Sequence, residues 1–173
     1  AFTHYLGWKH HCDEGIIMGL APYGDPFAKI PGSNKSYIQI LRDIILYNKK
    51  DKFNFKINLN WISYHEVRDK WVSDKFLKLF GPQKKYSPKP SQHKKNLAAA
   101  LQLRLEEVVL AQLKELKKID NFEYLCISGG VGLNCSLNGK IMSSGLFKEI
   151  FVQPASGDAG VAYGACILSS NIS

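Results

Sequence analysis

Long apolar runs are missing from this sequence of 173 residues, in which 45% of the residues are hydrophobic and 22% are charged. None approaches the roughly 18 apolar residues that a transmembrane helix needs. The first residues also lack the basic start and apolar core of a secretory signal. We therefore expect a soluble, cytoplasmic globular chain with no membrane partner. The sequence opens on Ala1 and not on Met, and we interpret it as a cropped part of a longer protein.

Paired cysteine motifs are also missing. The four cysteines show no C-x-x-C spacing, and three of them lie among apolar or small residues, where a buried free thiol packs well. His10 and His11 adjoin one cysteine, but adjacent side chains diverge, which disfavours a shared metal ion there. The four cysteines are Cys12, Cys126, Cys135 and Cys166.

Arginine is scarce: 20 of the 23 basic residues are lysine, and the net charge is +8. The lysines are densest between Lys70 and Lys95. Such a face could attract phosphate-bearing ligands or nucleic acid. Lysine, however, lacks the planar, bidentate donor set of arginine. We therefore expect a solvated surface, and nucleic acid is not a favoured partner.

Residues 25–90 show mixed patterns. Residues 37–47 are apolar and fit a helix as well as a strand. Between residues 53 and 59, apolar and polar residues alternate, which predicts a half-buried strand of a small hairpin. Three prolines within residues 81–91 mark the best candidate linker. We interpret residues 25–90 as a peripheral insert and linker.

The C-terminal half has clearer periodicity. Leucines and valine at three- to five-residue spacing predict one long amphipathic helix over residues 92–118. After it, short apolar runs alternate with glycine turns and helical stretches, which favours an α/β layer with parallel strands. The expected strands are 124–127 and 149–152, and the expected helices are 133–142 and 159–168.

Two glycines stand where the first of these strands passes into a helix. Gly129 and Gly130 allow the backbone to turn tightly and to approach a ligand, and the following helix offers unpaired N–H groups. Asn134, in the expected first turn, could add a side-chain amide. This pattern suits a phosphate cradle, but a structural turn without any ligand has the same pattern.

A second glycine turn follows the next strand, and it carries an acid. Asp158 comes directly after Gly157 at the expected start of a helix. The carboxylate could cap that helix, or it could hold a divalent cation that bridges to nucleotide phosphates. Because both turns follow neighbouring parallel strands, we expect them at one edge of the sheet, where α/β proteins bind ligands. Together they indicate a nucleotide site.

A third pattern, from Glu14 to Gly24, is a short helical stretch with small residues and a rigid Pro-Tyr-Gly exit. Physical argument alone assigns it to packing. In order and spacing, however, the three patterns together resemble the O-carbamoyltransferase family of the NodU/CmcH type. The matching residues are Met18 to Gly24, then Gln102, Glu106 and Glu107 in the long helix, then Gly129 to Val131 with Asn134, and finally Gln153, Pro154 and Gly157 to Gly160.

The resemblance covers most of residues 1–24 and 91–168 and implies a fold. Members of this family resemble the actin-like ATPases, whose ribonuclease H-like fold has two lobes. The resemblance implies that residues 1–173 are part of the carbamoyltransferase domain, namely the second lobe. The first lobe and a YrdC-like domain would then be missing partners, and the isolated chain would be incomplete and inactive.

The resemblance also implies a reaction. A carbamoyladenylate is made from carbamoyl phosphate and ATP, and its carbamoyl group is moved to a hydroxyl of a small molecule. A divalent metal ion, iron or magnesium, assists. Ile16 stands where the family usually has lysine. By position in the motifs, Asp158 would bind the metal ion, Gly129, Gly130, Asn134 and Gly157 would contact the nucleotide, and Glu14 would lie near the ribose or the carbamoyl path.

Three other functions remain open at this point. The first is a tRNA threonylcarbamoyl transferase-like enzyme, for which the lysine-rich surface would matter. The second is a sugar kinase-like phosphotransferase, in which Asp158 would serve phosphoryl transfer. The third is a nucleotide-binding module whose active site has decayed, in line with Ile16.

Overall fold

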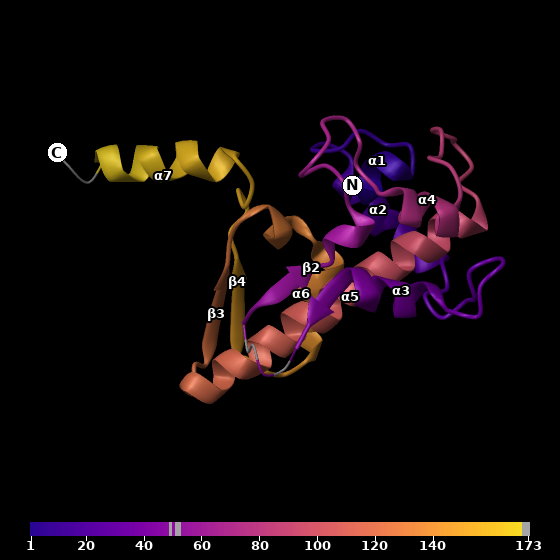
Figure 1. Ribbon diagram of the computed structural model, residues 1–173. Helices are drawn as coiled ribbons and strands as arrows, with labels where there is room; N and C mark the ends of the chain where they lie inside the picture. Colours follow the sequence, from indigo (N-terminus) through magenta and orange to yellow (C-terminus); the bar gives the residue numbers. More distant parts are fainter. Residues whose placement is uncertain (49, 51–52, 171–173) are drawn as a thin grey trace. The chain divides into compact units, whose positions relative to one another are not determined.

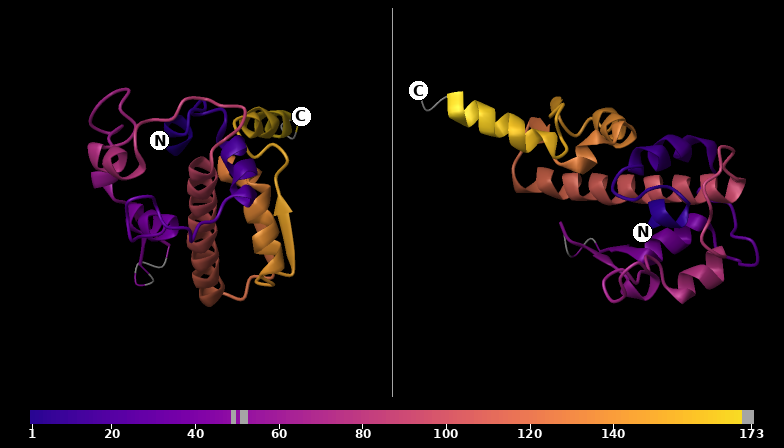
Figure 2. Two further views of the ribbon diagram at one scale, coloured as in Figure 1. Left: turned by 90° about the vertical axis from the view of Figure 1, so that its right-hand side faces the viewer. Right: turned by 90° about the horizontal axis from the view of Figure 1, so that it is seen from above.

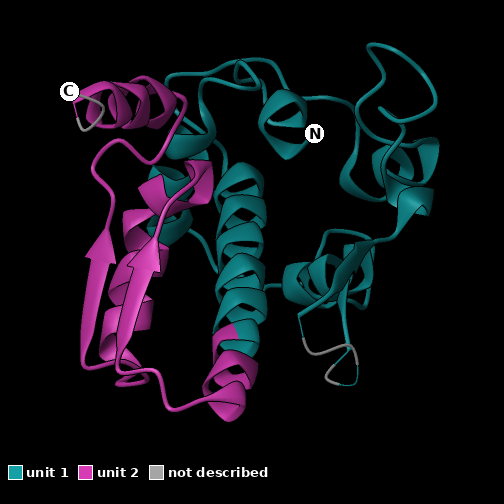
Figure 3. Cartoon of the chain, turned by 90° about the vertical axis from the view of Figure 1, so that its left-hand side faces the viewer, with its two compact units in different colours: residues 1–112 teal, residues 113–173 magenta. Residues whose placement is uncertain are grey.

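The computed structural model describes residues 1–48, 50 and 53–170. The chain divides into two compact units, unit 1 over Ala1–Gln112 and unit 2 over Leu113–Ser173 (Figure 3). Unit 1 consists of short elements followed by the longest helix (Figure 1). Its elements are α1 (Phe2–Tyr5), α2 (Glu14–Leu20), η1 (Ala21–Tyr23), α3 (Tyr37–Ile44), β1 (Ile45–Tyr47), β2 (Phe55–Ile57), η3 (Leu59–Trp61), α4 (Asp74–Phe80) and most of α5 (Gln92–Ile119).

The predicted long helix is confirmed, and its observed bounds differ from the predicted ones by one residue. It was predicted over residues 92–118, and α5 spans Gln92–Ile119 as one unbroken helix (Figure 2). Its first half is the buried half, because Leu97, Ala98 and Ala100 are completely inaccessible to solvent. The helix therefore serves as the support on which the core of unit 1 is built.

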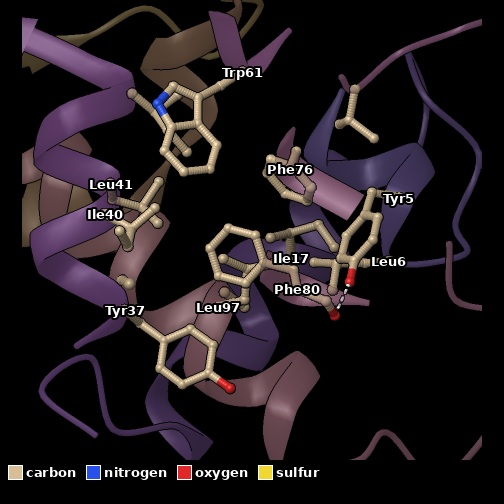
Figure 4. Close-up of a cluster of buried hydrophobic side chains, with 14 of the residues drawn as sticks. Tyr5, Leu6, Ile17, Tyr37, Ile40, Leu41, Trp61, Phe76, Phe80 and Leu97 are labelled. Atoms are coloured by element: carbon tan, nitrogen blue, oxygen red, sulfur yellow. Dashed lines mark hydrogen bonds between the residues drawn. The ribbon is translucent and has the colours of Figure 1, made fainter. Parts of the chain in front are cut away.

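A cluster of aromatic and aliphatic side chains forms the core of unit 1 (Figure 4). Tyr5, Phe76 and Leu97 lie in it with no measurable exposure. Residues 25–90 supply more than half of the cluster, so the predicted insert does not fold apart from its flanking segments. Its place at the periphery of a complete enzyme stays a prediction.

The ambiguous segment 37–47 contains both a helix and a strand. Ser36 and Gln39 form a capping box, in which each side chain accepts the main-chain N–H of the other residue, and this box starts α3. At Ile45 the backbone becomes extended and β1 begins. β1 pairs antiparallel with β2, which confirms the predicted hairpin, although β2 is limited to Phe55–Ile57.

The predicted linker, residues 81–91, contains no helix or strand, as expected. It is nevertheless held in place, because the Lys84 N–H donates to the Tyr5 carbonyl at 2.8 Å and Lys94 Nζ donates to the Lys85 carbonyl at 2.7 Å. The division between the two units lies inside α5 and not at this segment.

Unit 2 is an α/β unit, as predicted. β3 (Tyr124–Ile127) and β4 (Glu149–Val152) pair in parallel with Tyr124 opposite Glu149. They alternate with α6 (Cys135–Ser143) and α7 (Ala159–Ser170). Along both strands exposed residues alternate with half-buried ones. One face of the pair is therefore covered, and the other, with Tyr124 and Phe151, is open to solvent within this unit.

None of the four cysteines, all of which are described residues, forms a disulfide bond, as predicted, but the predicted burial is wrong. Each cysteine is exposed. Cys126 shares the solvent-facing side of β3 with Tyr124, because side chains two residues apart on a strand point to the same face. None of the helices formed by the described residues is both long and apolar enough to cross a membrane.

Candidate nucleotide and metal site

The first glycine turn begins where β3 ends. Gly129 has φ +91°, a left-handed conformation that favours glycine, and it reverses the chain into the 3₁₀ turn η4 (Gly130–Leu133). The Gly132 N–H donates to the Gly129 carbonyl at 2.8 Å and closes the turn. Gly129 and Gly130 are exposed, so the backbone of this turn is accessible to a ligand.

Asn134 ends the turn and starts α6. Its backbone is extended, and its side-chain Oδ1 accepts the Leu137 N–H at 2.9 Å, which makes it the N-cap. We predicted that the helix starts at residue 133 and that Asn134 lies in its first turn. The helix instead starts at Cys135, because residues 130–133 form the 3₁₀ turn η4 and Asn134 is the N-cap. Asn134 thus has a structural role, while its contact with a nucleotide stays a prediction.

The second glycine turn follows β4 and is closed by its own hydrogen bonds. The Ser156 hydroxyl donates to the Gln153 carbonyl, and the Gly160 N–H donates to the Gly157 carbonyl at 3.0 Å. Ser156 is buried, at 4% exposure. The turn is therefore a fixed structure that presents the residues after it, beginning with Asp158.

The two turns lie side by side. Both strands run in the same direction and the Gln153 N–H donates to the Ile127 carbonyl at 2.9 Å, so the turns leave the same edge of the pair (Figure 1). A methyl group placed on Gly132 would lie 3.0 Å from Ser156 Oγ, and one placed on Gly157 would lie 3.6 Å from Leu133 Cδ1. The predicted meeting of the turns at one sheet edge is confirmed.

Asp158 is exposed at this edge. Among the described residues, no N–H donates to its carboxylate; only its main-chain carbonyl is used, by the Val161 N–H at 3.2 Å. The alternative role as a side-chain helix cap is therefore not supported. The carboxylate is available to another ligand.

A metal ion would need more than this carboxylate. Across residues 1–48, 50 and 53–170, no group of three or more His, Cys, Asp or Glu side chains is arranged to hold one. An exposed carboxylate suits Mg²⁺ or iron as one ligand of a larger set. Asp158 fits that role chemically, and its metal binding stays a prediction.

Glu14 lies in unit 1, whereas the glycine turns lie in unit 2. It is the first residue of α2, and its Oε1 accepts the His11 N–H at 2.8 Å. Partial burial alone would raise the pKa of Glu14, but hydrogen bonds from His11, from its own N–H and from Thr3 outweigh burial and lower it. Glu14 is thus ionised at neutral pH and anchors α2. Its contact with a ribose or a carbamoyl group stays a prediction.

The Met18-to-Gly24 run has a packing role, as physical argument predicted. It forms the end of α2 and the turn η1. Gly24 touches α5 directly: a side-chain carbon built there would lie 2.0 Å from the Lys95 carbonyl oxygen. The adjacent Asp25 N–H donates to Asn96 Oδ1 at 2.9 Å. The run therefore joins the N-terminal segment to the start of the long helix.

One charged cluster was not predicted as a unit. Glu107 accepts hydrogen bonds from Arg42 on α3 and from Arg104 one turn earlier on α5, the latter at 2.9 Å. Of these residues only Glu107 was singled out, through the family resemblance. The spacing of Arg104 and Glu107 was the available signal, since residues three apart are neighbours on a helix.

Comparison with protein families assigns residues 1–167 to the family described as Carbamoyltransferase N-terminus. The chain belongs to this family. The predicted resemblance to carbamoyltransferases is thus confirmed. The match covers unit 1 together with nearly all of unit 2, so both units are parts of the carbamoyltransferase N-terminal region.

Several curated proteins are similar to this carbamoyltransferase-family chain. It is 37% identical over 168 residues to the uncharacterized protein sll1178 of Synechocystis sp., covering 96% of the chain and 26% of that protein. It is 38% identical over 169 residues to the nodulation protein NolNO of Sinorhizobium fredii, covering 96% of the chain and 21% of that protein. It is 36% identical over 159 residues to the nodulation protein NolO of Bradyrhizobium diazoefficiens, covering 92% of the chain and 25% of that protein. The chain therefore spans about a quarter of the length of these relatives.

Proposed function

We propose that this chain supplies part of the nucleotide and metal site of an enzyme that transfers a carbamoyl group to a hydroxyl of a small molecule. The donor would be a carbamoyladenylate made from carbamoyl phosphate and ATP. The observation that carries this proposal is the pair of adjacent glycine turns at one edge of a parallel sheet, with the exposed Asp158 beside them. Membership of the carbamoyltransferase family supports the reaction class.

The turns have the chemistry that a nucleotide phosphate requires. Gly129 and Gly130 expose main-chain atoms without side-chain hindrance, and N–H groups at helix starts carry partial positive charge. Two such turns on neighbouring strands can contact one phosphate chain from two sides. We propose that Gly129, Gly130, Asn134 and Gly157 contact the nucleotide, with Glu14 near its ribose or the carbamoyl path.

The metal role falls to Asp158. A divalent cation, when bound, neutralises phosphate charge and polarises the carbamoyl carbonyl. Because the described residues contain no group of three or more His, Cys, Asp or Glu side chains that could hold a metal ion, we propose that the remaining ligands come from a first lobe outside this chain. We likewise propose that the fold of the complete domain is ribonuclease H-like, as in actin-like ATPases, which the parallel β3–α6–β4–α7 order supports.

The transfer itself is a substitution at the carbamoyl carbon. The acceptor oxygen forms a bond to this carbon, the bond between the carbon and the adenylate phosphate oxygen breaks, and AMP leaves. The hydroxyl proton passes to a base or to water. In this step the glycine turns would hold the leaving phosphate, and fixed N–H groups facing it would stabilise the charge that develops there.

The test is a substitution of Asp158 in the longer enzyme that the resemblance implies. Asp158→Asn removes the charge and keeps the shape, so we expect carbamoyl transfer to fall by at least about a hundredfold, as for a lost metal ligand or its partner. Glu149→Gln is the matched control. Glu149 is exposed on β4, and its substitution removes the same charge from the same unit.

Product analysis separates the rival functions. Carbamoylated acceptor and AMP, formed only when carbamoyl phosphate is present, support the proposal. A phosphorylated acceptor formed without carbamoyl phosphate would favour the sugar kinase-like alternative. Unchanged transfer in the Asp158→Asn enzyme would contradict the metal role, whatever the product.

A further inference from the structure

Unit 1 contains a pocket of about 480 Å³ between α3, the β1–β2 hairpin and α5. It is lined by Arg42, Leu46, Tyr47, Asn48, Lys56 and Arg104. We infer that this pocket binds a small molecule that carries a phosphate monoester. This inference goes beyond the proposed carbamoyl transfer and does not depend on it, because every residue that it uses belongs to unit 1.

The first argument is the charge of the lining. Three of the lining side chains are cations, and Glu107 is the one carboxylate that the described residues place in contact with them. Burial alone would raise the pKa of Glu107, but hydrogen bonds and charge from Arg42 and Arg104 outweigh it and lower that pKa. Glu107 is therefore ionised and balances one of the three positive charges. A phosphate monoester carries roughly −1.5 to −2 charges at pH 7, which matches what remains.

The second argument is the rigidity of Arg104. Arg104 is 8% exposed, and its Nε and Nη2 donate to the Ile45 carbonyl at 2.9 and 2.7 Å. Its Nη1 donates to Glu107 at 2.9 Å. The guanidinium is thus fixed before any ligand arrives, which lowers the entropic cost of binding.

The third argument is the set of donors that remain. Arg42 uses Nε and Nη2 on Glu107, and no described residue accepts a hydrogen bond from its Nη1. Within the described part of the chain, Lys56 Nζ has no hydrogen bond and no ion pair. Guanidinium and ammonium groups with unused N–H bonds are the donors that proteins use for phosphate.

The fourth argument is size. A volume of about 480 Å³ exceeds that of a phosphate group and falls within the usual range for small-molecule sites. Leu46 lies directly opposite Lys56 in the hairpin register and provides an apolar surface beside the cation. The pocket therefore suits a phosphate attached to an organic body.

The test uses phenyl phosphate as the probe, titrated into the 173-residue chain by calorimetry at constant ionic strength. We expect saturable one-to-one binding with a Kd of about 0.1–1 mM. Benzoate, which has a similar ring and a single charge, should bind at least about tenfold more weakly. Inorganic phosphate should compete with phenyl phosphate, because both use the same cations.

Two variants locate the binding. Lys56→Gln should weaken phenyl phosphate binding by about tenfold, which corresponds to one charge-assisted hydrogen bond. Lys78→Gln removes the same charge from an exposed position on α4 that does not line the pocket, and it should leave the Kd unchanged. Leu46→Glu, at a 42% exposed position, places a carboxylate beside Lys56 and should abolish binding.

The inference is overturned if phenyl phosphate shows no saturable binding, or if Lys56→Gln and Lys78→Gln bind it equally well. Benzoate binding as tightly as phenyl phosphate would overturn the assignment to phosphate. Circular dichroism of each variant should match that of the wild type, since Lys56, Lys78 and Leu46 are all exposed.

Discussion

The two units of the chain differ in how far their apolar side chains are buried. In unit 1, large aromatic residues such as Phe76 and Tyr37 are at most 1% exposed. In unit 2, the described residues include comparable side chains that lie open, such as Phe151 at 57% and Val161 at 79%. No described residue of α7 is buried, although this helix carries no charged residue.

This difference shows that apolar content does not by itself make a core. α4 buries Phe76 and Phe80 because the N-terminal segment and α3 contribute side chains to the same cluster. The outer face of the β3–β4 pair and α7 have no such neighbours among the described residues of unit 2. Exposed apolar surface is typical of contact surfaces where it forms a large patch. We therefore expect unit 1 to hold its own structure and unit 2 to gain stability from contact.

The largest expected effect compares one phenylalanine from each unit. Phe76 is fully buried, with its ring centroid 4.8 Å from that of Tyr5 and 4.5 Å from that of Phe80. Phe76→Ala should lower the free energy of unfolding by about 3–5 kcal/mol. Phe151→Ala should change it by about 0.5 kcal/mol or less. Urea unfolding monitored by circular dichroism measures the free energy of unfolding of both variants. Equal decreases in the two variants would contradict the difference between the units.

The next effect is a pH dependence confined to unit 1, which contains all five histidines. Burial, assisted by the charge of Lys84, lowers the pKa of His93 to about 4. His93 Nδ1 lies 2.8 Å from the Tyr37 hydroxyl. Protonation thus favours the unfolded state, where the pKa is about 6.5. The contribution of His93 to stability is complete above pH 6.5 and is lost as the pH falls from 6.5 through 4.

Urea unfolding at a series of pH values measures this loss. We expect roughly 1–2 kcal/mol once the partial exposure of the ring is allowed for. His93→Gln keeps a polar side chain but does not titrate, so its stability should lose this part of the pH dependence. An identical pH profile in the variant would assign the effect to other groups.

The smallest effect separates the capping role of Asn134 from its proposed contact with a nucleotide. Asn134→Ala removes the cap of α6 and should cost about 1 kcal/mol. Asn134→Asp keeps an equally good cap, so stability should change by only a few tenths of a kcal/mol. The added charge should nevertheless weaken ATP binding by about tenfold. Calorimetry with ATP and hydrogen exchange of α6 test this, and unaltered ATP affinity in the aspartate variant would limit Asn134 to its structural role.

Regular periodicity made much of the fold predictable. The long leucine pattern predicted α5 to within one residue at its end, and the glycine turns delimited β3 and β4 at their observed bounds. The pattern failed at residues 37–47, because an apolar run fits either kind of element and the chain uses both. It also misplaced the start of α6, since the cap at Asn134 outweighed the apolar Leu133.

The site was predictable to the extent that strand direction determines it. Parallel strands bring their following turns to one edge, and the residues around Gly129 and Gly157 meet there as expected. The pocket with Arg42 and Arg104 was not predictable in the same way. These arginines are 62 positions apart, and they meet through Glu107 only because α3 packs against α5. No local pattern carries that information.

Gly24 ends the run by which the sequence most clearly resembles its family. A Cβ at this position would lie 2.0 Å from one main-chain atom of Lys95 and 2.3 Å from another, and no rotamer change can move a backbone atom. Even alanine would push the first turn of α5 away from the N-terminal segment. Glycine is thus required at the last residue of this run, because two stretches of main chain cross there with no room for a side chain between them.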